Sequence, residues 1–181
     1  DQAKLITTTG NVAFNDLFCK LVVKSVSDTA FVRVTHNWVT PDPLKEPLPG
    51  VILSPYRYWH IDGIIPEGFD AEIQFTYMVT GFVDNTLITR PGDSLFILYR
   101  PSPAVDWQSV EFTRVGTWQA GIIKLPSFQK GEYTLALKDY TTMVYEPEIQ
   151  ENNKLFCFPN PGNELITISW TYDNCNLIEV M

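Results

Sequence analysis

The segment TAFVRVTHNWV, Thr29–Val39, decides the fold class because its side chains alternate strictly between two sets along its length. Successive side chains of a β-strand point to opposite faces of the sheet, so this period of two predicts a strand. Phe31 and His36 fall on opposite faces. The pattern therefore predicts a strand without deciding which face is buried.

The same period recurs through the first 145 residues. We expect further strands in residues 17–26, 56–64, 69–80, 94–101, 107–115, 120–126 and 131–140, separated by turns rich in Gly, Pro, Asp and Ser. Four prolines in segment 40–50 predict an extended connecting loop. No window of a dozen residues carries a helical apolar stripe. Short strands at this spacing predict an all-β fold, specifically an immunoglobulin-like β-sandwich.

The 181 residues divide into three parts. Residues 1–145 form the predicted sandwich, and the acidic, then Asn-rich residues 146–153 form a linker. Residues 154–181 resume with strands and turns but are too few to bury a core of their own. We therefore expect the last part to begin a second, truncated domain, and the chain to be a piece of a larger protein.

Charge and composition narrow the classes of partner. With 13 basic and 21 acidic residues, the chain carries a net charge of −8, whereas nucleic-acid binding normally requires a basic surface. No apolar run approaches the roughly 20 residues of a membrane-spanning helix. Cys157 and Cys175 lie in neighbouring predicted strands and are a candidate disulfide. In the other interpretation, Cys19, Cys157 and Cys175 are all small, buried hydrophobic residues.

Motifs for catalysis are absent from the sequence. Neither of its two histidines lies in an H-E-x-x-H zinc motif, and there is no Gly-x-Ser-x-Gly elbow or phosphate-binding glycine loop. We therefore predict no catalytic residue, no metal site, no cofactor and no enzymatic activity. His36 is interpreted as a sheet-face residue with a hydrogen-bonded ring nitrogen. A glycoside hydrolase would need paired carboxylates, for which the candidates are Asp62, Glu67, Asp70 and Glu72.

Aromatic side chains are densest in SPYRYWHIDGI, Ser54–Ile64. Exposed Tyr and Trp side chains offer rigid, amphipathic surface for stacking on sugar rings or peptide side chains. The stacking candidates are Trp38, Tyr58, Trp59 and Trp107. The other interpretation places Trp59 and Ile61 in the core, with Arg57 stacked over an aromatic ring.

The stretch LFCFPNPGNELITISW, residues 155–170, resembles the opening of the C-terminal sorting domain of type IX secretion. Members of that family begin with a hydrophobic residue, a Pro-Asn-Pro turn and a short apolar strand. The Gly-Arg turn and the final strands of the family are missing here. The resemblance implies a secreted or surface-attached protein that uses the secretion machinery as a partner. The matching residues are Phe158, Pro159, Asn160, Pro161, Leu165, Ile166 and Ile168.

Two other stretches, VTHNWVTPDP at 34–43 and RYWHIDG at 57–63, resemble the non-catalytic β region of secreted M1-family zinc aminopeptidases of Bacteroidetes. In that family the zinc ligands and the glutamate base belong to an upstream domain, so none is carried onto this chain. The resemblance implies a non-catalytic accessory domain whose partner is the upstream peptidase domain of the same polypeptide. A carbohydrate- or peptide-binding module of unknown ligand is the alternative, and a free-standing hydrolase is the third hypothesis.

The same resemblance implies two modification sites. Proteins secreted by these bacteria are O-glycosylated at Asp-Ser/Thr-hydrophobic tripeptides, which makes Thr29 and Ser94 candidates. An Asp-Thr or Asp-Ser pair before a strand is also ordinary turn chemistry.

Overall fold

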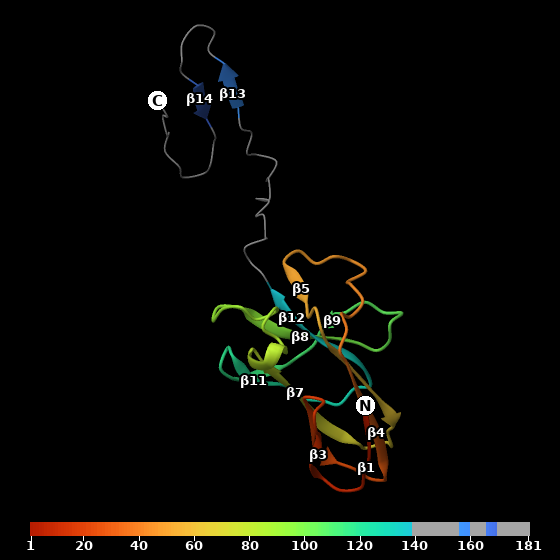
Figure 1. Cartoon of the computed structure of the whole chain (residues 1–181). Coiled ribbons are helices and arrows are strands. Elements are labelled where there is room, and N and C mark those ends of the chain that lie inside the picture. The colour runs from red at the N-terminus through yellow and green to blue at the C-terminus, as the bar shows by residue number, and fades with distance from the viewer. Residues whose placement is uncertain (139–155, 160–165, 170–181) are drawn as a thin grey trace. The chain divides into compact units, whose positions relative to one another are not determined.

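The computed structural model describes residues 1–138, 156–159 and 166–169, and the chain divides into two compact units, Asp1–Met143 and Val144–Met181 (Figure 1). Within the described residues every regular element is a β-strand, apart from one 3-10 turn, η1 (Thr80–Phe82). The predicted all-β class is therefore confirmed.

The described strands of the first unit form two sheets, in which all pairings are antiparallel. The seven-stranded sheet has the order β1 (Gln2–Ile6), β4 (Ala30–Asn37), β6 (Tyr58–Ile64), β12 (Gly131–Lys138), β8 (Ser94–Arg100) and β9 (Gln108–Ser109), with β5 (Val51–Leu53) also paired to β12. The five-stranded sheet has the order β10 (Thr113–Gly116), β11 (Ala120–Leu125), β7 (Asp70–Met78), β3 (Cys19–Ser25) and β2 (Gly10–Phe14).

One apolar core fills the space between the two sheets. The ring of Phe75, on β7 of the five-stranded sheet, lies 4.6 Å from that of Trp59 and 5.1 Å from that of Tyr133, centroid to centroid. Trp59 and Tyr133 belong to β6 and β12 of the seven-stranded sheet. Because these rings join the two inner faces, the predicted β-sandwich is confirmed, whereas its immunoglobulin-like topology stays a prediction.

The inner face of β4 carries Ala30, Val32, Val34 and His36, which are all buried. Its outer face carries Phe31 and the polar residues that alternate with it. The tertiary structure thereby decides which face of this strand is buried, a question that alternation alone left open. Burial of three aliphatic side chains from this face removes apolar surface from water, at roughly 25 cal/mol per Å².

Three short strands, β1, β2 and β5, lie outside the segments in which we expected strands. Their sequences, QAKLI, GNVAF and VIL, are too short or too mixed to show a clear period of two. The single strand expected over 107–115 is instead two, because β9 pairs in the seven-stranded sheet and β10 in the five-stranded sheet. The proline-rich segment 41–50 contains no strand, as predicted.

A second, smaller apolar cluster covers part of the outer face of the seven-stranded sheet. Leu98, Trp107 and Ala136 are buried there, with Leu44 and Leu53 packed against them. The connecting loop after β4 therefore folds over this region, and Leu53 of β5, which is paired with β12 in the sheet, packs beside it. Strands β8 and β12 are consequently buried on both faces.

The second unit contains β13 (Phe156–Pro159) and β14 (Ile166–Ser169), which form an antiparallel pair. Cys157 is opposite Ile168, and Phe158 is opposite Thr167. The predicted linker 146–153 lies outside the described residues.

Candidate functional site

The segment Arg57–Ile61 supplies side chains to both faces of the sheet because it alternates along the start of β6. The side chains of Arg57, Trp59 and Ile61 point inward and are completely buried. Those of Tyr58 and His60 lie on the outer face and are half-buried. The interpretation that placed Trp59 and Ile61 in the core is therefore confirmed. Arg57 also stacks on aromatic rings, with its Cζ atom 4.6 Å from the Trp59 centroid and 5.0 Å from that of Phe18.

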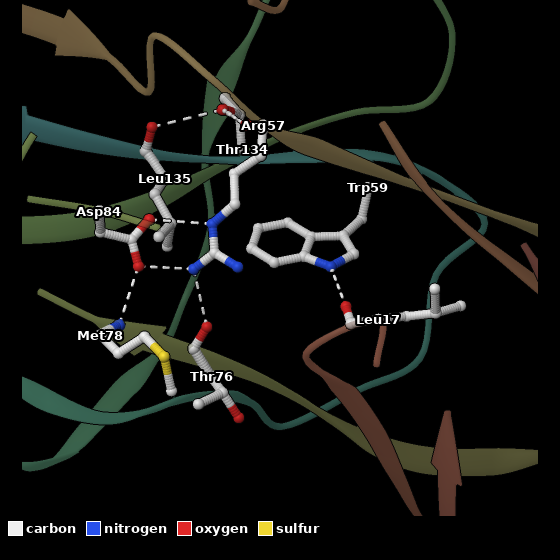
Figure 2. A network of polar contacts seen from close by, with 8 residues as sticks. All are labelled: Leu17, Arg57, Trp59, Thr76, Met78, Asp84, Thr134 and Leu135. Carbon is white, nitrogen blue, oxygen red and sulfur yellow. Dashed lines mark hydrogen bonds and ion pairs between the residues drawn. The ribbon is translucent and has the colours of Figure 1, made fainter. Parts of the chain in front are cut away.

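A buried ion pair holds Arg57 in place (Figure 2). Its Nε and Nη2 atoms donate to Asp84 Oδ1 and Oδ2 at 2.9 and 2.6 Å, and Nη2 also donates to the Thr76 carbonyl oxygen at 2.9 Å. Asp84 accepts a further hydrogen bond from the Met78 backbone N–H. In Figure 2 the third guanidinium nitrogen points toward the Trp59 indole, which is consistent with a weak N–H···π contact in place of a hydrogen bond. The pair thus ties the start of β6 to the end of β7.

His36 lies in an aromatic cluster beside this pair. Its ring stacks on Trp59 at 5.2 Å and contacts Phe18 at 5.5 Å and Trp38 at 4.4 Å. Neither ring nitrogen has a hydrogen-bond partner among the described residues, so the expectation of a hydrogen-bonded ring nitrogen is wrong. Burial, with the neighbouring Arg57 charge, lowers the pKa of His36 to about 4, so the imidazole is neutral at pH 7.

The four aromatic stacking candidates do not form one exposed row. Trp59 and Trp107 are buried and offer no exposed ring for stacking. Trp38 is 59% exposed, directly after the end of β4, and Tyr58 is half-buried on the outer face of the seven-stranded sheet. Trp38 follows the alternation of the inner-face residues of β4, whereas Tyr58 belongs to the outer face. Trp38 and Tyr58 therefore lie on different surfaces.

The outer face of the seven-stranded sheet carries a block of four polar side chains. Thr35 and Asn37 of β4 lie directly opposite His60 and Tyr58 of β6. All four are half-buried, and none of their side chains forms a hydrogen bond with another described residue. We call these four residues the polar block. Their hydrogen-bonding groups are available to a molecule that approaches this face.

Charged residues next to the polar block are paired with one another. Glu132 is opposite His60 on one side and Arg100 on the other. Arg100 donates to Glu132 Oε2 at 2.6 Å and to Asp42 Oδ2 at 2.8 Å. The guanidinium lies over the Trp107 ring at 4.3 Å, and the Trp107 Nε1–H donates to the Asp42 carbonyl oxygen at 2.9 Å. Trp107 therefore supports this ion network rather than facing a ligand.

The carboxylates next to Tyr58 influence its phenol. Burial, followed by the charges of Glu132 and Asp42, raises the pKa of Tyr58 above its usual value. The phenol, which an ordinary tyrosine also keeps protonated at neutral pH, is thus a hydrogen-bond donor here.

At the opposite end of the same face lies an exposed apolar row that the sequence analysis missed. Leu5 of β1 is opposite Phe31 of β4, which is opposite Ile64 of β6. Their exposed fractions are 70, 37 and 75%. The row is formed by strands that are distant in sequence, so only the strand register reveals it. We call these three residues the apolar row.

Two of the four candidate carboxylates, Asp62 and Asp70, lie in separate surface ion pairs, and Glu72 accepts a hydrogen bond from the Gln74 side chain. Asp62 pairs with Arg33 at 3.4 Å and Asp70 with Lys24 at 3.4 Å, with all four side chains about half exposed. Within the described part of the chain, no three His, Cys, Asp or Glu side chains lie together so as to hold a metal ion. The same residues contain no helix with the length and apolarity needed to cross a membrane.

The two glycosylation candidates lie at strand ends. Thr29 is exposed directly before β4, and its backbone N–H donates to the Asp28 side chain, which is ordinary turn chemistry. Ser94 is the half-buried first residue of β8, opposite Lys138. Modification of either residue stays a prediction.

The sorting motif and the candidate disulfide fall largely outside the described residues. Phe158 and Pro159 lie in β13 and Ile168 in β14, whereas Asn160, Pro161, Leu165 and Cys175 are not among the residues described. Cys19 is buried in the sandwich, and burial raises the pKa of its thiol.

Comparisons with protein-family models, with curated proteins and with solved structures found no match.

Proposed function

We propose that this chain is a non-catalytic accessory domain of a larger secreted or surface-attached metallopeptidase of the M1 type. In this proposal, residues 154–181 are the beginning of a type IX secretion sorting domain. The observation that carries it is the apolar row, because contiguous exposed apolar surface marks a contact with another protein surface. The partner is the upstream peptidase domain of the same polypeptide.

The buried polar groups support a scaffolding role. Arg57 and Asp84 satisfy one another and the neighbouring backbone, and Arg100 is engaged by two carboxylates. Such pairs hold loops and strands in place rather than presenting a reactive group to a cleft. The resemblance of segments 34–43 and 57–63 to the β region after M1 peptidases points in the same direction.

The intact mass of the native protein from its host culture, measured with and without reduction, tests the proposal. We expect a mass several-fold above 20.6 kDa, the mass of this chain. A native mass near 20.6 kDa would contradict the accessory-domain proposal. A rise of about 2 Da on reduction corresponds to two hydrogens per disulfide and would indicate a bridge such as Cys157–Cys175.

The contact itself is tested in the full-length protein with the double substitution Leu5→Ser and Ile64→Thr. We expect faster cleavage between the domains in limited proteolysis, because the apolar row no longer packs on its partner. Val115→Thr is the matched control, since Val115 is also exposed but lies on β10 of the other sheet. Equal cleavage rates in wild type, double variant and control would rule out the apolar row as the contact.

A further inference from the structure

We propose that the polar block on the outer face of the seven-stranded sheet, Thr35, Asn37, Tyr58 and His60, is a binding site for neutral carbohydrate. This inference goes beyond the accessory-domain proposal and does not depend on it, because the site lies entirely within the sandwich. The cross-strand register carries the argument, since it brings four uncommitted polar side chains together on adjacent strands.

The geometry of the block suits one or two sugar rings. Residues directly opposite each other on antiparallel strands have Cβ atoms about 5 Å apart, and neighbours on the same face of one strand are separated by about 7 Å. Asn37–Tyr58 and Thr35–His60 are such pairs, two residues apart along each strand. Four hydrogen-bonding groups therefore lie within the span over which a pair of linked sugar rings presents its hydroxyl groups.

The chemistry of the block matches hydroxyl groups in particular. A threonine or tyrosine hydroxyl and an asparagine amide can each both donate and accept a hydrogen bond, and an imidazole ring contributes two hydrogen-bonding nitrogens. A sugar hydroxyl has the same dual character. An anionic ligand would instead require unpaired cations, and the cations beside the block, Arg100 and Arg33, are paired with carboxylates. The net charge of −8 also disfavours polyanions.

Tyr58 adds an aromatic surface to these polar groups. Its ring is half-buried at the first position of β6, so its orientation is restricted by the neighbouring strands. A restricted aromatic side chain binds at a low cost in conformational entropy, and its polar tip stays available for a hydrogen bond. The combination of one aromatic ring with several polar groups suits a sugar ring, because the sugar ring has an apolar C–H face and a polar rim.

The apolar row and the polar block are separate patches of the same face. Their nearest members on β4, Phe31 and Thr35, are four residues apart, which corresponds to about 13 Å at 3.3 Å per residue. The Arg33–Asp62 ion pair lies between the two patches.

Binding is measured with the purified 181-residue chain and a defined panel of neutral glycans. The panel comprises glucan, mannan, xylan and galactan in affinity gel electrophoresis, followed by isothermal titration with the hexasaccharide of any polymer that retards the chain. We expect at least one polymer to retard it. Tyr58→Ala and His60→Ala should each weaken binding at least tenfold. Failure of the whole panel to retard the chain would overturn the proposal.

Matched controls locate the site. Tyr56→Ala and Trp38→Ala remove exposed aromatic rings at the neighbouring strand end and should leave binding unchanged. If Tyr58→Ala lowers the melting temperature, Tyr58→Phe and Asn37→Ala serve as milder variants, each with an expected loss of at least threefold. Loss of binding in Trp38→Ala or Tyr56→Ala, but not in the polar-block variants, would overturn the assignment. Displacement of the sugar by a proline-rich peptide, with tighter peptide binding, would overturn the ligand class.

The outcome is distinguishable from that of the mass measurement. A native mass near 20.6 kDa together with sugar binding would reject the accessory domain and leave this site intact. A larger native mass without binding to any glycan would support the accessory domain and reject the carbohydrate site.

Discussion

Arg57 and Asp84 form a bidentate ion pair of 2.9 and 2.6 Å in which neither side chain has any surface exposed to solvent. The two residues are 27 positions apart in the sequence and come from the start of β6 and from the loop after β7. Figure 2 shows how the pair is completed by the backbone of Thr76 and Met78. A buried charge is tolerated only when it is paired and hydrogen-bonded, and Arg57 meets both conditions through its Nε and Nη2 atoms.

Removing one partner of this pair should be strongly destabilising. We expect Asp84→Ala to lower the free energy of unfolding by about 3–5 kcal/mol, because it leaves the Arg57 charge buried and unpaired. Urea unfolding followed by tryptophan fluorescence measures the loss. Arg33→Ala, which breaks the exposed Arg33–Asp62 pair, should lower it by less than about 1 kcal/mol. Similar losses in the two variants would refute the distinction between buried and exposed pairs.

His36 should make the stability of the sandwich depend on pH. Burial and the Arg57 charge lower its pKa in the folded state to about 4 from an ordinary value of 6.5, so the unfolded chain takes up the proton first as the pH falls. The contribution of His36 is therefore complete above pH 6.5 and is lost between pH 6.5 and about 4, by roughly 3 kcal/mol.

This loss is measured as the difference between wild type and His36→Phe, which keeps a ring in the stack but cannot be protonated. We expect the two urea-unfolding curves to diverge progressively as the pH falls from 6.5 to 4. His60→Gln, which changes the half-buried histidine on the outer face, should follow the wild type. If the free energy of unfolding of wild type and His36→Phe changed in parallel with pH, a neutral His36 imidazole would not be required for the stability of the sandwich.

Gly63 should tolerate no larger side chain. It lies in β6 with φ of 144°, and a Cβ atom there would come within 1.9 Å of the Phe31 carbonyl oxygen. We expect Gly63→Ala to lower the free energy of unfolding by at least about 4 kcal/mol, since backbone strain and steric overlap with β4 add together. Gly10, with φ of 123°, has no atom within 4 Å of an added Cβ, and Gly10→Ala should show only the backbone cost of about 1–3 kcal/mol. Denaturant titration measures the free energy of unfolding of both variants. An equal loss of stability in Gly63→Ala and Gly10→Ala would contradict the steric argument.

Cys19 should be inert in the folded protein. Its thiol is buried in the core between the sheets, and burial raises its pKa, so almost no thiolate is present at pH 7. In a Cys157→Ser, Cys175→Ser background, where Cys19 is the only remaining cysteine, a thiol reagent should react at the rate of global unfolding. Rapid labelling under native conditions would show that the core opens locally around β3.

Alternation in the sequence was a reliable guide to the local structure of the longer strands. Residues 30–37, 58–64 and 70–78 each form one strand within an expected segment. The alternative placement of Trp59 and Ile61 in the core, with Arg57 stacked on an aromatic ring, also followed from alternation and is confirmed. Local pattern succeeds in these cases because the direction of a side chain depends only on its position along the strand.

The sequence by itself therefore determined the all-β class, the larger strands and the division of each strand into two faces. Only the tertiary structure decided which face is buried, that Trp107 is covered by the loop after β4, and that Arg57 meets Asp84. It alone brought Leu5, Phe31 and Ile64 into the apolar row and formed the polar block from β4 and β6. The physical reason is that cross-strand neighbours depend on strand order and register, which arise from packing between distant segments and leave no periodic signal in any one of them.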